Sequence, residues 1–287
     1  MRKTLVAATL GLAFASPAAA LDTARLDAAV HAEEATLDAR VGAAVLDTKD
    51  GTNWAYRGDE RFPLDSTHKA FACAALLAKA DKGEVSLAKR VVIAPADLVA
   101  NSPITEKKAA PASISLGEMC AAALDYSDNT AANFVLAALG GPNAVTAFFR
   151  TLGDTASRLD RKETELNESA PGDPRDTTTP AAAVADLDKI LLGDALKPAA
   201  RAKLTQWMVD DRVAGPLLRA ALPAGWRIAD KTGAGGHGSR GIVAVIWPPE
   251  RPPLVAAIYI AETKASMGAR NAAIARIGAA LVEALGK

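Results

Sequence analysis

The chain has 287 residues, a length that allows one or two domains of ordinary size. Its composition, 50% hydrophobic and 23% charged, is typical of a globular protein and excludes a disordered chain. The 33 basic and 33 acidic residues balance, so charge gives no argument for a nucleic-acid partner. Two cysteines and three histidines are too few for a zinc ribbon or a disulfide-dense scaffold.

Residues 1–20 have the pattern of a signal peptide. Arg2 and Lys3 form a basic start, an apolar run follows over 5–15, and alanines at 18–20 form a small-residue cleavage site. A buried or membrane helix is the alternative, but a span needs about 20 apolar residues and this run is shorter. We therefore expect cleavage near Ala20, export to the periplasm or the medium, and no membrane anchor.

Export also bears on the state of Cys73 and Cys120. In an oxidising compartment these two cysteines are expected to form a disulfide. Closing the loop between them is worth about 4 kcal/mol by the chain-entropy argument. Two buried free thiols are the alternative.

The segment after the signal is predicted to form a helix followed by two strands. Apolar residues recur at helical spacing over 23–37, and a short apolar run at 41–46 predicts a strand. Asp50-Gly51 predicts a hairpin turn into a second strand at 54–56. From Ser66 onward helical patterns dominate, separated by Pro and Gly. These segments are 66–81, 116–125, 129–139, 142–151, 180–192 and 197–208.

Strands return near the end of the chain, followed by a last amphipathic helix. The strands are predicted at 226–231, 241–247 and 254–260, and the helix at 266–285. Strands at both ends with helices between them predict a composite α/β domain from 21–62 and 210–287, and an all-α domain from 63–209. The polar stretch 157–180 inside the helical part is too long for an ordinary connector, which indicates a functional or disordered loop.

Ser66 opens the first long helix of the middle region, and Lys69 follows one turn later. A serine at a helix start has backbone N–H groups and the positive end of the helix dipole nearby. Lys69 faces the same side, and a partly desolvated amine can activate a neighbouring hydroxyl as a nucleophile. For this motif alone, a helix cap followed by a surface lysine is the better interpretation.

Two further short motifs add to this one. Ser127-Asp128-Asn129 lies between two helical segments, where it can aim a hydroxyl and an amide at one cleft or cap a helix. Lys231-Thr232-Gly233 ends a predicted strand, where a cation and a hydroxyl can bind a carboxylate and the glycine lets a ligand approach the backbone. An exposed strand end is the alternative. Each motif is weak alone, but the three in this order are a strong signal.

With these motifs the chain resembles the class A serine β-lactamases over nearly its whole length after residue 20. The resemblance implies an α/β (α+β) fold with a five-stranded antiparallel sheet, flanking helices and an all-α domain, the active site lying between them. It implies hydrolysis of β-lactam antibiotics, penicillins above all, through a covalent acyl-enzyme. The stretch 222–238 is most similar to the carbenicillin-hydrolysing subgroup, which often has Arg at the position of Lys231.

The resemblance also implies a role for each motif residue. Ser66 is implied as the acylated nucleophile, Lys69 as its activator, and Ser127 as the proton shuttle to the lactam nitrogen. The backbone N–H groups of Ser66 and Ala234 are implied to form the oxyanion hole. The remaining implied substrate-binding residues are Asn129 for the acylamide side chain, Lys231, Thr232 and Arg240 for the carboxylate, and Gly233, which leaves room for the ligand.

The polar stretch resembles the family's omega loop, here 158–176. Glu163 is implied as the general base that activates a water, and Asn167 as the residue that holds this water. Arg161 and Asp176 are implied to close the loop by a salt bridge. The base for acylation stays open between Lys69 and Glu163 acting through a water.

Three positions depart from the family pattern. Thr164 stands where the loop glutamate is usually followed by Pro, so whether the Glu163–Thr164 peptide is cis stays open. Asn101 stands where many members carry an aromatic residue at the rim of the cleft. Asp65, directly before the nucleophile, puts a carboxylate near the site, where it is expected to alter the pKa of Lys69.

Other functions share parts of this pattern. A D-alanyl-D-alanine peptidase and a non-hydrolysing penicillin-binding sensor carry the same three motifs, but the first lacks the deacylating glutamate loop and the second is usually tethered to a membrane. His31, His68 and His237 are scattered, so we expect no metal and no cofactor. His68 is expected to pack away from the site and His237 to lie in an exposed turn. We expect a monomer acting on a small-molecule β-lactam.

Overall fold

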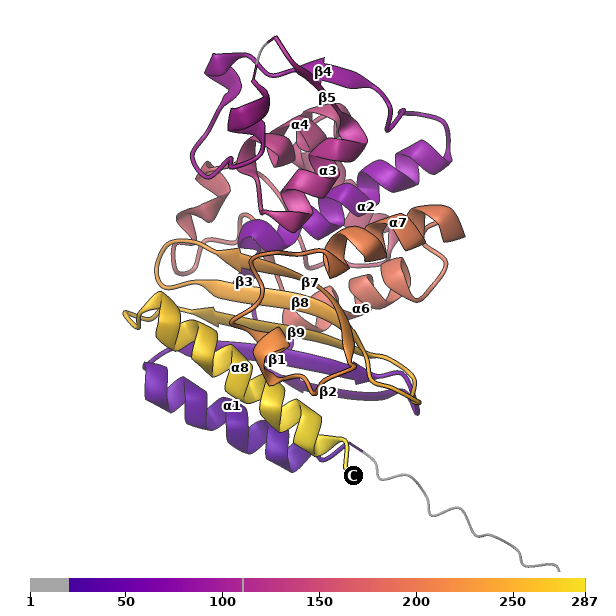
Figure 1. The fold of residues 1–287 in the computed structure, drawn as a ribbon. Helices are drawn as coiled ribbons and strands as arrows, with labels where there is room; N and C mark the ends of the chain where they lie inside the picture. The colour runs from indigo at the N-terminus through magenta and orange to yellow at the C-terminus, as the bar shows by residue number, and fades with distance from the viewer. Residues whose placement is uncertain (1–20, 110, 287) are drawn as a thin grey trace, which may run out of the picture.

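A computed structural model describes residues 21–109 and 111–286, so the predicted signal segment lies outside the described residues. The centre of the fold is a five-stranded antiparallel sheet, whose strands lie one below the other in Figure 1, from β7 to β2. Its strands in spatial order are β2 (Thr52–Tyr56), β1 (Arg40–Asp47), β9 (Leu254–Ala261), β8 (Arg240–Trp247) and β7 (Arg227–Ala234). The first and last parts of the chain therefore share one sheet.

Helices cover both faces of this sheet, which explains why its central strands are almost wholly apolar. Along β8, Ile242 and Ala244 join the core cluster under α1 (Thr23–Leu37) and α8 (Met267–Ala284). The alternating residues Val243 and Val245 join the second core cluster, on the side of the helical part. Figure 1 shows α1 and α8 side by side on the outer face, with the helical part beyond the other.

The helical part is built around α2 (His68–Asp81), which is buried without interruption from His68 to Leu77. Its many alanines let neighbouring helices approach closely. The helices in this part are α3 (Leu116–Asp125), α4 (Asn129–Leu139), α5 (Pro142–Thr151), α6 (Pro180–Leu191) and α7 (Pro198–Val209). A disulfide joins Cys73 on α2 to Cys120 on α3, with 5.7 Å between the two Cα atoms, so the predicted pairing is confirmed.

The predicted fold class is confirmed, with local differences. The helical part also holds two short two-stranded sheets that the sequence patterns miss: β3 (Phe62–Pro63) with β6 (Thr177–Thr178), and β4 (Arg90–Val92) with β5 (Ser113–Ser115). Strands of two or three residues are too short to show a period of two. The regular helix begins at His68, because residues 65–67 form a single 3-10 turn. The strand predicted to end at residue 231 continues to Ala234, paired with Arg240.

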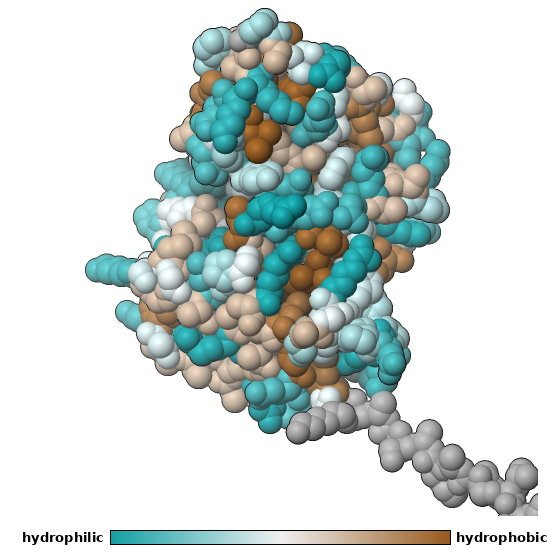
Figure 2. Space-filling model, in the orientation of Figure 1, coloured by the Kyte–Doolittle hydropathy of each residue, from teal (hydrophilic) through white to brown (hydrophobic). Residues whose placement is uncertain are grey.

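No single helix in the described ranges is long and apolar enough to cross a membrane, although the bent pair α4 and α5 would pass by length and composition alone. On the face shown in Figure 2, hydrophobic residues reach the surface in separate patches among hydrophilic ones. Large hydrophobic side chains that are exposed in the described part of the chain are Val92, Tyr126, Val213 and Met267.

Candidate active site

The nucleophile candidate Ser66 lies in the 3-10 turn between β3 and α2, where this turn touches β7. A Cβ atom added at Gly233 of β7 would lie 3.1 Å from the backbone nitrogen of Ser66 and 2.9 Å from the carbonyl oxygen of Leu64. Such contacts are closer than Cβ atoms tolerate, so only glycine lets the strand approach this closely. The sequence Lys231-Thr232-Gly233 thus brings the end of β7, including Ala234, against the turn of the nucleophile.

Lys69 is fully buried and surrounded by acceptors. Its Nζ donates to Ser66 Oγ over 2.9 Å, to the Ser127 carbonyl oxygen over 2.8 Å and to Asn129 Oδ1 over 2.6 Å. It also lies 3.1 Å from Glu163 Oε1. Burial lowers the pKa of Lys69, which the Glu163 carboxylate partly opposes. A lowered pKa increases the fraction of neutral amine, the form that can take a proton from Ser66.

Ser127 stands between two lysines. Its Oγ accepts from Lys69 Nζ and from Lys231 Nζ, each over 3.2 Å. Its backbone is held in the left-handed region, at φ 57°, directly before the N-cap residue of α4. Burial lowers the pKa of Lys231 to about 8, against the attraction of Asp211. The arrangement provides a path along which protons can pass between Ser127 and either amine.

Asp128 and Asn129 have separate structural tasks. Asp128 is the N-cap of α4 and also accepts from the backbone N–H and hydroxyl of Thr105, which fixes the loop before it. Asn129 Oδ1 accepts from Lys69, while its Nδ2 donates to the Ala100 carbonyl oxygen over 2.9 Å. An amide nitrogen carries two hydrogens, so one donor of Asn129 is left for a ligand.

Glu163 is buried, with 1% of its surface exposed, and its carboxylate faces Lys69. Asn167 Nδ2 donates to Glu163 Oε2 over 2.5 Å. Burial acts to raise the pKa of Glu163, but Lys69 and the hydrogen bond from Asn167 outweigh it and lower the pKa. The carboxylate is therefore ionised at neutral pH and can act as a base. The peptide between Glu163 and Thr164 is cis.

Asn133 on α4 helps to position Glu163, and the sequence analysis missed it. Its Nδ2 donates to the Glu163 carbonyl oxygen over 2.8 Å, and its Oδ1 accepts from the Glu163 N–H over 2.9 Å. One side chain thus fixes the backbone on both sides of the loop glutamate. The available signal was its place one turn after Asn129, on a helix that begins at the motif.

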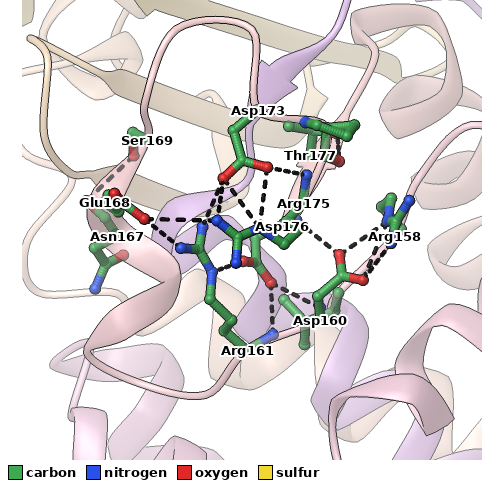
Figure 3. A network of polar contacts seen from close by, with 12 residues as sticks. Arg158, Asp160, Arg161, Asn167, Glu168, Ser169, Asp173, Arg175, Asp176 and Thr177 are labelled. Atoms are coloured by element: carbon green, nitrogen blue, oxygen red, sulfur yellow. Dashed lines mark hydrogen bonds and ion pairs between the residues drawn. The ribbon is translucent and has the colours of Figure 1, made fainter.

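The omega loop is closed at its base by charged side chains, shown in Figure 3. Arg161 Nε donates to Asp176 Oδ2 over 2.6 Å, and the Asp176 Oδ1 atom accepts from the backbone N–H groups of Asp160 and Arg161. Arg161 also reaches Glu168 and Asp173. These contacts join the two ends of the loop and hold the segment that carries Glu163.

Arg240 lies beneath the end of β7, on the neighbouring strand. It donates from Nη1 to the Gly233 carbonyl oxygen over 2.9 Å and from Nε to Asn271 Oδ1 over 2.8 Å. Burial lowers its pKa to about 10, so it stays cationic at neutral pH. Arg240 and Lys231 are thus two buried cations next to Thr232, and together they can bind an anionic group.

Three residues noted in the sequence lie as follows. The Asp65 carboxylate binds Ser169 and Ser239, and the charged residues that act on the Lys69 pKa are Glu163 and Asp128, so the expected effect of Asp65 on this pKa is wrong. His68 is buried, but its Nδ1 lies 3.9 Å from Glu163 Oε1, so it does not pack away from the site. Asn101 is exposed and donates to the Ser127 carbonyl oxygen, which makes this part of the rim polar.

The chain also matches known proteins along almost its whole length. Residues 24–285 match the model of the "Beta-lactamase enzyme family". The chain is 61% identical to "Beta-lactamase AER-1" of Aeromonas hydrophila over 266 residues, which cover 93% of this chain and 88% of that protein. The chain belongs to the class A β-lactamases.

Other relatives agree with this family. "Beta-lactamase CARB-3" of Pseudomonas aeruginosa is 51% identical over 249 residues, covering 87% of this chain and 86% of that one. The solved structure "Ancestral (GNCA) Beta-lactamase class A" has a TM-score of 0.88 and 52% identity, covering 90% of this chain and 99% of that one. As a class A serine β-lactamase, the protein hydrolyses β-lactams.

Proposed function

We propose that Ser66 is the nucleophile of this class A β-lactamase and that one buried network serves both halves of its reaction. Ser66 Oγ attacks the lactam carbonyl carbon, and the oxygen that becomes negative is held by the backbone N–H groups of Ser66 and Ala234. Each such donor is worth roughly 3–4 kcal/mol in the transition state. The close approach of Gly233 to the Ser66 turn supports this pairing.

The proton of Ser66 passes to a base as the new bond forms. Lys69 is in direct hydrogen-bond contact with Ser66 Oγ, and its lowered pKa favours the neutral amine. Glu163 lies next to Lys69, and it can accept the Ser66 proton instead if a water joins it to Ser66. When the lactam C–N bond breaks, Ser127 gives its hydroxyl proton to the nitrogen and recovers one from Lys69 or Lys231.

Substrate binding rests on the cationic end of the site. We propose that Lys231, Thr232 and Arg240 hold the substrate carboxylate. The free N–H of the Asn129 amide then donates to the acylamide side chain. Neither Lys231 nor Arg240 forms a hydrogen bond or an ion pair with a carboxylate among the described residues, which leaves both available to an anion.

The observation that carries the proposal concerns the release of the acyl group, which needs a water held beside Glu163. Glu163 Oε1 and Asn167 Oδ1 are buried oxygens with no hydrogen-bond partner among the described residues, although Oε1 is in ion-pair contact with Lys69. Buried polar atoms of this kind usually bind water. A water held there gives its proton to Glu163 while its oxygen attacks the ester carbon. Ser66 Oγ then leaves with a proton from Lys69, and Lys69 recovers one from Glu163.

We further propose penicillins as the preferred substrates, export through the 1–20 segment, and a monomeric protein. The similarity of residues 222–238 to the carbenicillin-hydrolysing subgroup supports the first. The disulfide supports an oxidising compartment. The scattered positions of the exposed hydrophobic residues support a monomer.

The test is penicillin turnover with intact-protein mass spectrometry. Wild-type protein quenched during turnover is expected to carry one penicilloyl group on Ser66 and to lose it once substrate is consumed. A Ser66→Ala variant of unchanged fold is expected to carry none and to be inactive. Turnover by that variant, or a wild-type adduct that never leaves, would overturn the proposal.

A further inference from the structure

The buried carboxylate of Asp65 sits directly before the nucleophile and has no part in the mechanism above. It is 1% exposed, and its backbone is in the left-handed region at φ 43°. The side chain lies between the omega loop and the turn from β7 to β8, where its oxygens meet Ser169 and Ser239. An ionisable group at such depth needs partners to remain charged.

Two serines from distant parts of the chain supply these partners. Ser169 in the omega loop donates from Oγ to Asp65 Oδ1 over 2.8 Å. Ser239, the residue before β8, donates from Oγ to Asp65 Oδ2 over 2.6 Å. One carboxylate therefore joins the nucleophile turn, the omega loop and the β7–β8 turn. We call Asp65, Ser169 and Ser239 the Asp65 clamp.

The neighbouring backbone is shaped to admit this carboxylate. A Cβ atom at Gly235 would overlap Asp65 Oδ1 and Ser169 Oγ, so a side chain at 235 would displace the clamp. Next to it, the Gly236 N–H donates to the Asn167 carbonyl oxygen over 2.8 Å. The omega loop is thus attached to the turn from β7 to β8 at Asn167 and, through Asp65, at Ser169.

The clamp lies close to the residues proposed to bind the water. Ser169 is two residues from Asn167, and Asn167 donates to Glu163. By contrast, Lys69 lies in the buried first turn of α2, and Ser66 lies in the buried 3-10 turn that leads into this helix. Loss of the clamp should therefore displace the water-binding pair more than the acylating pair.

We propose that Asp65 is a positioning residue for deacylation: its ionised carboxylate holds the omega loop against the β7–β8 turn, so that Glu163 and Asn167 keep their place. This rests on the proposed role of Glu163 and Asn167 in the release of the acyl group. The residue acts through Ser169 and does not touch the substrate.

The charge of Asp65 depends on all the ionisable groups around it. Burial raises its pKa to about 6, against the hydrogen bonds from Ser239 and Ser169. The groups that act on it are Arg240 on β8, Arg270 on α8, Glu163 in the omega loop and Tyr259 on β9, while His68 on α2 contacts only the backbone oxygen of Asp65. The two arginines favour the ionised form of Asp65, and Glu163 opposes it. Burial keeps His68 and Tyr259 uncharged at neutral pH. The Asp65 carboxyl group is therefore mostly ionised above a pH of about 6 and mostly protonated below it.

The experiment separates acylation from deacylation by stopped-flow kinetics with a penicillin and by mass spectrometry of the acyl-enzyme. Asp65→Asn, which keeps the shape but cannot ionise, is expected to slow deacylation about tenfold, because a hydrogen bond to a charged group is lost. Acylation is expected to change less than about threefold. Ser169→Ala, which removes only the arm in the omega loop, is expected to show the same selective loss.

The pH profile gives a second readout that a structural role would not move. Wild-type deacylation is expected to fall in an acid limb near pH 6, and this limb is expected to vanish in Asp65→Asn. A limb due to Glu163 lies below 4.5, because its pKa is lowered from that value. An unchanged limb in Asp65→Asn would overturn the proposal.

A matched control is Ser157→Ala. This change removes a buried hydroxyl pair that flanks the loop, Ser157 with Thr178 at 2.7 Å, without touching Asp65. Ser157→Ala is expected to leave the ratio of the deacylation rate to the acylation rate unchanged. If Ser157→Ala lowers that ratio as much as Ser169→Ala, the inference fails. If Glu163→Ala releases the acyl group normally, the proposed function fails instead.

Discussion

The salt bridge at the base of the omega loop allows a stability prediction worked from individual contacts. Asp176 is 1% exposed and accepts three N–H groups: two backbone donors on Oδ1 and Arg161 Nε on Oδ2. In Asp176→Asn the amide oxygen can keep both backbone bonds, which places its NH₂ group against Arg161 Nε. One charge-assisted bond is replaced by two facing donors, which costs about 2–3 kcal/mol.

Glu168→Gln is the matched control, because Glu168 pairs with the same arginine but is exposed. Its loss is expected to cost less than about 1 kcal/mol, as for other surface ion pairs. The assay is the free energy of unfolding from reversible urea denaturation of the two variants and the wild type. Equal losses in the two variants, or a loss below 1 kcal/mol in Asp176→Asn, would refute the reasoning.

Three further predictions follow from the same structure. Replacing Cys73 and Cys120 together by serine is expected to lower the free energy of unfolding by up to about 4 kcal/mol, and no difference from the oxidised wild type in urea would contradict this. Asn133→Ala, which frees the backbone of Glu163, is expected to slow deacylation about tenfold in single-turnover kinetics, with a normal rate as the opposing result. The KM for a penicillin is expected to rise above pH 8, as Lys231 loses its charge; a KM that is flat from pH 7 to 9, or the same rise in Lys231→Arg, would oppose that role.

Much of the architecture was predictable because its signals are local. The helices at 116–125, 129–139 and 142–151 were placed at their observed bounds, since apolar spacing, Pro and Gly mark them within a few residues. The same holds for Ser66 and Lys69, whose spacing of one helical turn brings a hydroxyl and an amine together. Periodicity alone could separate the sheet from the helical part.

Other features depend on contacts between distant segments and left little local trace. Asp65 was seen as a carboxylate near the site, but its partners Ser169 and Ser239 lie more than a hundred positions away in the chain. A serine in a loop carries no signal of what it will contact after folding. Asn133 was missed because a polar residue on a helix usually faces solvent. The left-handed backbone conformation of Asp65 was not visible in the sequence either.

The central claim is that making and releasing the acyl-enzyme depend on different residues of one network. Glu163→Ala tests it most directly, by the mass of the Ser66 peptide followed over time after a single addition of penicillin. The account predicts that the penicilloyl adduct forms and then persists, because the base for the water is gone while Lys69 remains. Loss of the adduct at the wild-type rate would contradict it.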